Sequence, residues 1–75
     1  MVLSDLKLGE KARIKDFSKL PVMVRRRLID MGIYEGVEVC LKSNMPFGGP
    51  CMIETYGQCV GIRRNEASTI RVVKA

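Results

Sequence analysis

The pattern of apolar and polar residues predicts a chain made mainly of short strands. In residues 11–15, Ala12 and Ile14 alternate with three basic residues, as expected of an antiparallel strand with one buried face. The same alternation recurs in residues 37–41, 51–56, 59–63 and 70–72. We expect one face of these segments to form the core, with the inward residues Ala12, Ile14, Val37, Val39, Leu41, Cys51, Ile53, Thr55, Val60 and Ile62.

A change of period predicts one helix, over residues 21–31. Apolar residues there recur at helical spacing and share one face: Leu20, Val24, Leu28 and Met31. Pro21 suits the first turn, where its missing N–H needs no partner, and Gly32 suits the left-handed position that closes a helix. A helix of about three turns is unstable alone, so it must dock on the sheet or on a partner.

The connections complete the predicted fold. Residues 43–50 are a loop by composition, Gly57-Gln58 is a tight connection, and residues 65–68 form a short helical turn. Five short antiparallel strands with one helix between the first and second are typical of a small barrel or sandwich. We expect a single domain over residues 1–75, mainly β in class.

Size, charge and composition favour a binding module over an enzyme. A chain of 75 residues rarely encloses a catalytic pocket, and the absence of histidine excludes mechanisms that need it. The net charge of +5 could attract nucleic acid, but the arginine clusters at residues 25–27 and 63–64 are not interleaved with aromatic residues. No apolar run is long enough to span a membrane and the start lacks a signal peptide, so we expect a cytoplasmic protein.

The three cysteines are expected to be reduced thiols. Cys40, Cys51 and Cys59 show neither zinc-site spacing nor the pattern of a secreted disulfide framework. The strand pattern predicts that Cys51 is buried and that Cys40 and Cys59 face outward.

The segment from Arg25 to Gly36 carries the most information. Three consecutive arginines cannot all lie on a buried helix face, and Arg26 and Asp30 are spaced to form a weak surface pair. Asp30, however, lies in the last turn, where the helix dipole disfavours an acid. Either a tertiary hydrogen bond to Asp30 or a docked partner would explain the arrangement, and both interpretations stay open.

Three segments together resemble the FeoA family. They are Leu6-Lys7-Leu8-Gly9-Glu10, residues 26–36 (RRLIDMGIYEG) and residues 60–72 (VGIRRNEASTIRV). The resemblance covers nearly the whole chain and implies an SH3-like barrel. It also implies a cytoplasmic partner of the membrane ferrous iron transporter that carries an N-terminal G-protein domain. Family members are often described as binding transition metals, but the cysteines of this chain occupy positions where the family usually has other residues. No metal site is therefore transferred to them.

The resulting hypothesis is a non-enzymatic accessory protein of ferrous iron uptake that docks on the transporter's cytoplasmic portion. The main alternative is a module that binds or senses a transition metal ion, Fe²⁺ or Zn²⁺. We expect no tightly bound cofactor. A basic barrel that binds nucleic acid is a third interpretation. The residues proposed for docking are Arg25, Arg26 and Ile29, followed by Met45 and Phe47, and those proposed as structural are Leu28, Asp30, Gly32 and Gly36.

Overall fold

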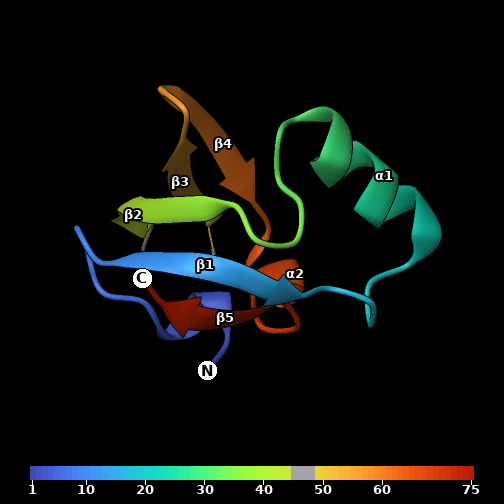
Figure 1. The fold of residues 1–75 in the computed structure, drawn as a ribbon, viewed down its shortest axis with the longest axis horizontal. Helices are drawn as coiled ribbons and strands as arrows, with labels where there is room; N and C mark the ends of the chain where they lie inside the picture. The colour runs from blue at the N-terminus through green and yellow to red at the C-terminus, as the bar shows by residue number, and fades with distance from the viewer. Residues whose placement is uncertain (45–48) are drawn as a thin grey trace.

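The computed structural model describes residues 1–44 and 49–75, which form one antiparallel sheet with short helices around it (Figure 1). The sheet has five strands in the order β4-β3-β2-β1-β5. They are β1 (Lys11–Asp16), β2 (Glu38–Asn44), β3 (Cys51–Thr55), β4 (Gln58–Ile62) and β5 (Arg71–Lys74). The helices are the 3-10 helix η1 (Leu3–Asp5), α1 (Val22–Asp30) and α2 (Arg64–Ala67). The predicted mainly β fold, with a helix between the first two strands, is confirmed.

The core lies on the face of the sheet that the alternation predicts. Every residue expected to point inward from the strands is buried, and Leu3, Leu6, Phe17, Ile33, Ala67 and Ile70 join them from the connecting segments. Val24 of α1 and Met31, the residue that caps its C-terminal end, pack against this core, and Leu28 of the same helix is fully buried. The predicted inner face of the helix is thus confirmed.

The end of α1 is set by a left-handed glycine, as predicted. Gly32 has a φ of 89°, and the N–H groups of Gly32 and Ile33 donate to the carbonyls of Ile29 and Leu28 at 3.0 and 2.8 Å. This is the double hydrogen bond of a Schellman motif. Its usual apolar contact is supplied by Leu28 and Ile33, both fully buried. The motif therefore turns the chain from the helix directly back into the core.

Several local predictions need correction. Pro21 is the N-cap residue of α1 and has an extended ψ of 151°. The helix therefore begins at Val22, one residue later than predicted. The β3–β4 connection is Tyr56-Gly57 rather than Gly57-Gln58, because Thr55 pairs directly with Gln58. Strand β2 continues to Asn44 into the predicted loop, and α2 begins at Arg64, one residue before the predicted turn.

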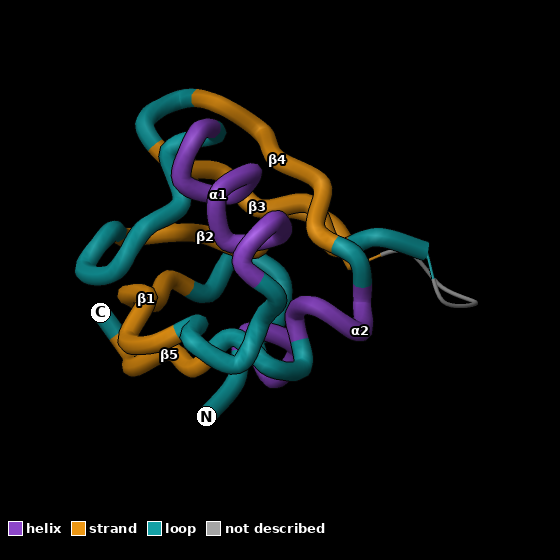
Figure 2. Tube along the Cα trace, turned by 90° about the vertical axis from the view of Figure 1, so that its right-hand side faces the viewer, coloured by secondary structure: helices purple, strands orange, loops and turns teal. Residues whose placement is uncertain are grey.

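Helix α1 lies to the right of the sheet in Figure 1 and in front of it in the perpendicular view of Figure 2. Its inner face meets the core, and its opposite face is left without cover from the described chain. Among the described helices, none is both long and apolar enough to cross a membrane.

Candidate functional site

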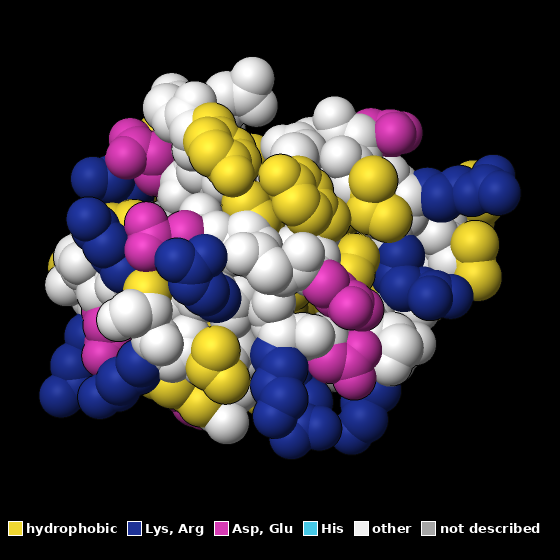
Figure 3. Space-filling view, viewed as in Figure 1, with side chains coloured by type: hydrophobic (Ala, Val, Ile, Leu, Met, Phe, Trp, Pro, Cys, Tyr) yellow, Lys and Arg dark blue, Asp and Glu magenta, His cyan; other side chains and the backbone are white. Residues whose placement is uncertain are grey.

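The side of α1 that points away from the core is unusually apolar. Val22, Met23 and Ile29 are 54%, 77% and 50% exposed, whereas Leu28 on the other side is fully buried. At 100° per residue, these three residues and the exposed Arg26 lie within one third of the helix circumference. We call this set, Val22, Met23, Arg26 and Ile29, the outer face of α1. Figure 3 shows apolar and basic side chains next to one another over this helix.

The three consecutive arginines occupy three different environments. Arg26 is exposed, as predicted. Arg25, which was expected on the solvent side, is instead half-buried, and its Nε is shielded from solvent with no hydrogen-bond partner in the described chain. Its backbone position, three residues before the buried Leu28 and therefore next to it on the helix surface, turns it partly toward the barrel. Arg25 is therefore a weaker candidate for partner contact than Arg26.

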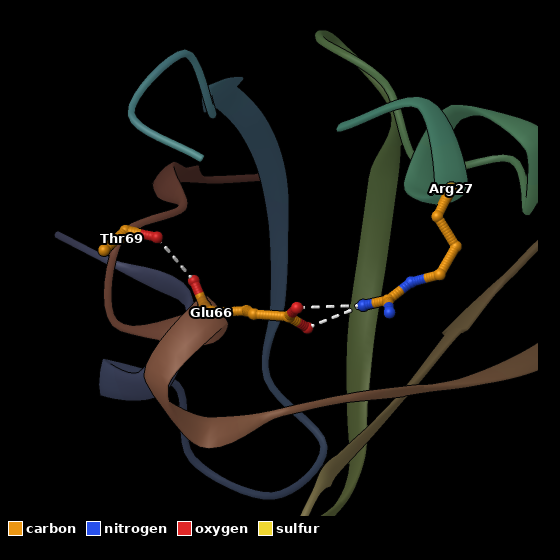
Figure 4. A network of polar contacts seen from close by, with 3 residues as sticks. All are labelled: Arg27, Glu66 and Thr69. Carbon is orange, nitrogen blue, oxygen red and sulfur yellow. Dashed lines mark hydrogen bonds and ion pairs between the residues drawn. The ribbon is translucent and has the colours of Figure 1, made fainter. Parts of the chain in front are cut away.

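Arg27 forms a tertiary ion pair that the sequence pattern did not reveal. Its Nη2 donates to both carboxylate oxygens of Glu66 at 2.9 Å (Figure 4). The Glu66 side chain is only 9% exposed, and its backbone carbonyl accepts a hydrogen bond of 2.8 Å from the Thr69 hydroxyl. A carboxylate removed from water needs such a partner. The pair therefore ties α1 to α2 and helps fix the orientation of the outer face of α1.

Within the described residues, Asp30 forms neither the surface pair with Arg26 nor the tertiary hydrogen bond considered in the sequence analysis. The residue is exposed, and no hydrogen bond or ion pair joins its carboxylate to Arg26 or to any other residue in 1–44 or 49–75. Gly36, also proposed as structural, has a φ of 90° and accepts a hydrogen bond from Arg13 at 3.3 Å. Met45 and Phe47, the remaining docking candidates, lie outside the described residues.

Two exposed tyrosines come together near the end of α1, a feature that sequence reasoning missed. Tyr34 follows the helix and is 44% exposed, and Tyr56 at the tip of the β3–β4 hairpin is 81% exposed. Hydrogen bonding to the Tyr56 side chain raises the pKa of the Tyr34 hydroxyl above its ordinary value. Tyr56 also has a φ of 49°, a left-handed conformation that is uncommon for a bulky residue. The pair adds aromatic surface at an exposed position.

The cysteines differ in accessibility and form no disulfide. Cys51 is buried and Cys59 is exposed, as predicted, whereas Cys40 is half-buried rather than exposed. Within the described part of the chain, no three Cys, Asp or Glu side chains are grouped so that they could hold a metal ion.

A small SH3-like barrel that displays an apolar and basic helix face belongs to the class of binding modules. The chain is a member of the FeoA family, since the family model for the FeoA domain matches residues 1–74. A search of curated protein sequences gives no match.

Solved structures agree with this assignment. FeoA from Chlorobium tepidum superposes with a TM-score of 0.91 at 35% identity, over 99% of this chain and 70% of that one. Iron(II) transport protein A from Clostridium thermocellum has a TM-score of 0.90 at 29% identity, over 100% of this chain and 46% of that one. Zinc-bound FeoA from Stenotrophomonas maltophilia, described as an SH3 domain protein and a candidate ferrous iron transport activating factor, has a TM-score of 0.79 at 28% identity, over 96% and 88% of the two chains.

Proposed function

We propose that the protein is an accessory factor of ferrous iron uptake that acts in the cytoplasm. Its membership in the FeoA family over residues 1–74 supports this role. So do the descriptions of two similar proteins, one as an iron(II) transport protein and one as a candidate activating factor of ferrous iron transport. The role is non-catalytic: the whole chain lacks histidine, and its size suits a binding surface better than an enclosed reaction site.

The partner in this proposal is the membrane ferrous iron transporter, bound at its cytoplasmic portion that bears the G-protein domain. The observation that carries the docking mode is the exposure of Val22, Met23 and Ile29 on a helix already anchored to the barrel through Leu28. Burying exposed apolar side chains at the centre of a contact, within a rim of arginine, is how many protein interfaces gain their energy. Arg26 beside them, in a chain of net charge +5, favours an acidic partner surface.

The double variant Arg26→Glu with Ile29→Ser tests the docking mode. Both side chains are exposed, and neither makes a hydrogen bond or ion pair with the described residues, so the fold should be retained. We expect co-purification with the full-length transporter to fall at least about tenfold, because a charge is reversed and an apolar contact is lost. Ferrous iron uptake by cells that carry the variant as their sole copy should fall in parallel.

A matched control makes the same kinds of change on the strands, away from α1 in sequence. Lys15→Glu with Val73→Ser also reverses one exposed base and removes one exposed apolar side chain, from β1 and β5. This variant should co-purify and support uptake like the wild type. If the α1 variant folds and behaves like the control, docking through the outer face of α1 is wrong, and Met45 and Phe47 become the next residues to change.

A second candidate function, binding of a transition metal ion, is favoured by the zinc-bound relative from Stenotrophomonas maltophilia. Anaerobic titration of the reduced protein with Fe²⁺ and with Zn²⁺, followed by calorimetry and thermal melting, tests it. Saturable binding at a one-to-one ratio that raises the melting temperature would support a metal-sensing module. If neither ion gives a binding signal, the metal-binding function is excluded and docking remains as the candidate function.

A further inference from the structure

The two edges of the sheet, β5 and β4, differ in how far other segments of the chain cover them. The β5 edge is covered: Val2 bridges to Arg71, the Leu3 N–H donates to the Ile70 carbonyl at 2.8 Å, and the Met1 carbonyl accepts from Val72. That strand also carries charge at both of its ends, Arg71 and Lys74. Charges and covering segments are the usual means by which proteins prevent a sheet edge from pairing with another chain.

Among residues 1–44 and 49–75, nothing gives the β4 edge either protection. The strand reads Gln-Cys-Val-Gly-Ile, without a charge or a proline, and it is the last strand of the sheet. Cys59 and Gly61 are both exposed. In Figure 2, β4 runs along the margin of the molecule.

The register of the β3–β4 hairpin shows which backbone groups this edge offers. Thr55 and Gln58 flank the two-residue turn and form a hydrogen-bonded pair, so the pairs alternate from there. The N–H and C=O groups of Val60 consequently face β3, whereas those of Cys59 and Gly61 point away from it. Since β4 has a strand neighbour on one side only, these four groups have no strand partner in the described chain.

A basic groove continues from the end of this edge. It has a volume of about 830 Å³ and is lined by Pro50, Gly61, Arg63, Arg64, Asn65 and Ser68. Gly61 thus belongs both to the free edge and to the groove. Its wall includes the exposed guanidinium of Arg63 and the exposed side-chain amide of Asn65, and none of its described lining residues is acidic, so the groove suits carboxylates.

We propose that the β4 edge binds an extended segment of another protein by strand addition, and that acidic residues of this segment enter the groove beside Arg63. Backbone hydrogen bonds to Cys59 and Gly61 supply the pairing, and the groove supplies the preference for acid. A second copy of this chain is a poor occupant, because its own β4 carries no carboxylate and each copy has a net charge of +5. This surface is separate from the outer face of α1 and does not depend on the proposed function.

The test uses the intact protein and a synthetic extended peptide of about eight residues, Asp-Glu-Thr-Val-Thr-Val-Asp-Glu, a usual strand length. Acid at both ends allows either strand direction. Amide hydrogen exchange measured by NMR should slow at Cys59 and Gly61 when the peptide is added and stay unchanged on β5. The analogue with Asn and Gln in place of the acids should bind at least about tenfold more weakly.

Paired variants separate backbone pairing from side-chain contact. Cys59→Pro removes one outward N–H, a change that an edge strand tolerates, whereas Cys59→Thr keeps it. The first should abolish peptide binding and the second should preserve it. Arg63→Glu should weaken binding, and Lys15→Glu, a matched charge reversal on β1, should not.

Any of three results with the peptides would overturn the proposal: no change in exchange at Cys59 and Gly61, equal binding by a folded Cys59→Pro variant, or equal binding of the neutral analogue. Slowed exchange of the same amides that grows with protein concentration, without peptide, would identify a second copy as the occupant and also overturn it. The exchange measurement on the unchanged protein decides the matter even if Cys59→Pro fails to fold.

Discussion

Replacing Gly32 by alanine measures how much the end of α1 depends on one backbone conformation. With φ at 89°, Gly32 occupies a region that L-residues rarely adopt. A β-carbon built there meets no atom within 4 Å, so the substitution creates no clash with the rest of the described chain. The cost is therefore purely conformational.

The magnitude follows from two opposing effects. Holding an L-residue in the left-handed region costs roughly 1–2 kcal/mol. Alanine also restricts the unfolded chain more than glycine does, which returns about 0.4–1 kcal/mol. The net loss in free energy of unfolding is about 1 kcal/mol, which lowers the melting temperature of a domain this small by about 4–8 °C.

Urea and thermal denaturation followed by circular dichroism provide the assay, with two companions to Gly32→Ala. Gly32→Asn should lose less free energy of unfolding than Gly32→Ala, because asparagine tolerates the left-handed region better than alanine does. Gly61→Ala should be close to neutral, since φ there is not positive and the new β-carbon makes ordinary contacts with Met52 Sδ at 3.4 Å and Pro50 Cβ at 4.0 Å. An unchanged stability for Gly32→Ala, or a larger loss for Gly61→Ala, would refute this reasoning.

Three further predictions concern stability and reactivity. Arg27→Met leaves the Glu66 carboxylate unpaired and should cost about 1–2 kcal/mol, and adding Glu66→Leu should restore part of this in denaturant titrations. The hydrogen bond from the backbone N–H of Ser18 lowers the pKa of Asp16, so its stabilising contribution is present above the unfolded pKa and is lost as the pH falls through the folded one. Asp16→Asn should therefore melt with a weaker dependence on pH below about pH 4. Maleimide should label the native cysteines in the order Cys59, Cys40, Cys51.

The strands could be predicted because each one buries a single face. A period of two survives wherever one side of a strand meets the core, as at Ala12 and Ile14, and these side chains are buried as the alternation requires. The end of α1 was predictable for a comparable reason, since glycine after an apolar helical run indicates a left-handed residue. Local patterns of this kind carry information that needs no tertiary contact.

Other features depend on contacts between distant parts of the chain, and no periodicity reports them. Arg27 and Glu66 are 39 residues apart, so their pairing becomes visible only when α1 and α2 are placed together. Tyr56 at a left-handed turn position was missed because asparagine or glycine is usual there. Val22 and Met23 are the exception: they were not assigned to a face in the sequence analysis, although counting around the helix places them with Arg26 and Ile29.

The most direct test of docking through the outer face of α1 is an NMR titration of the isotope-labelled protein with the full-length transporter in detergent. We predict that the methyl signals of Met23 and Ile29 broaden and lose intensity first, because both side chains are exposed on that face. The buried methyl groups of Val60 and Ile62 should follow only as the whole complex tumbles more slowly. Selective loss of signals from another surface, with Met23 and Ile29 unaffected, would contradict the account.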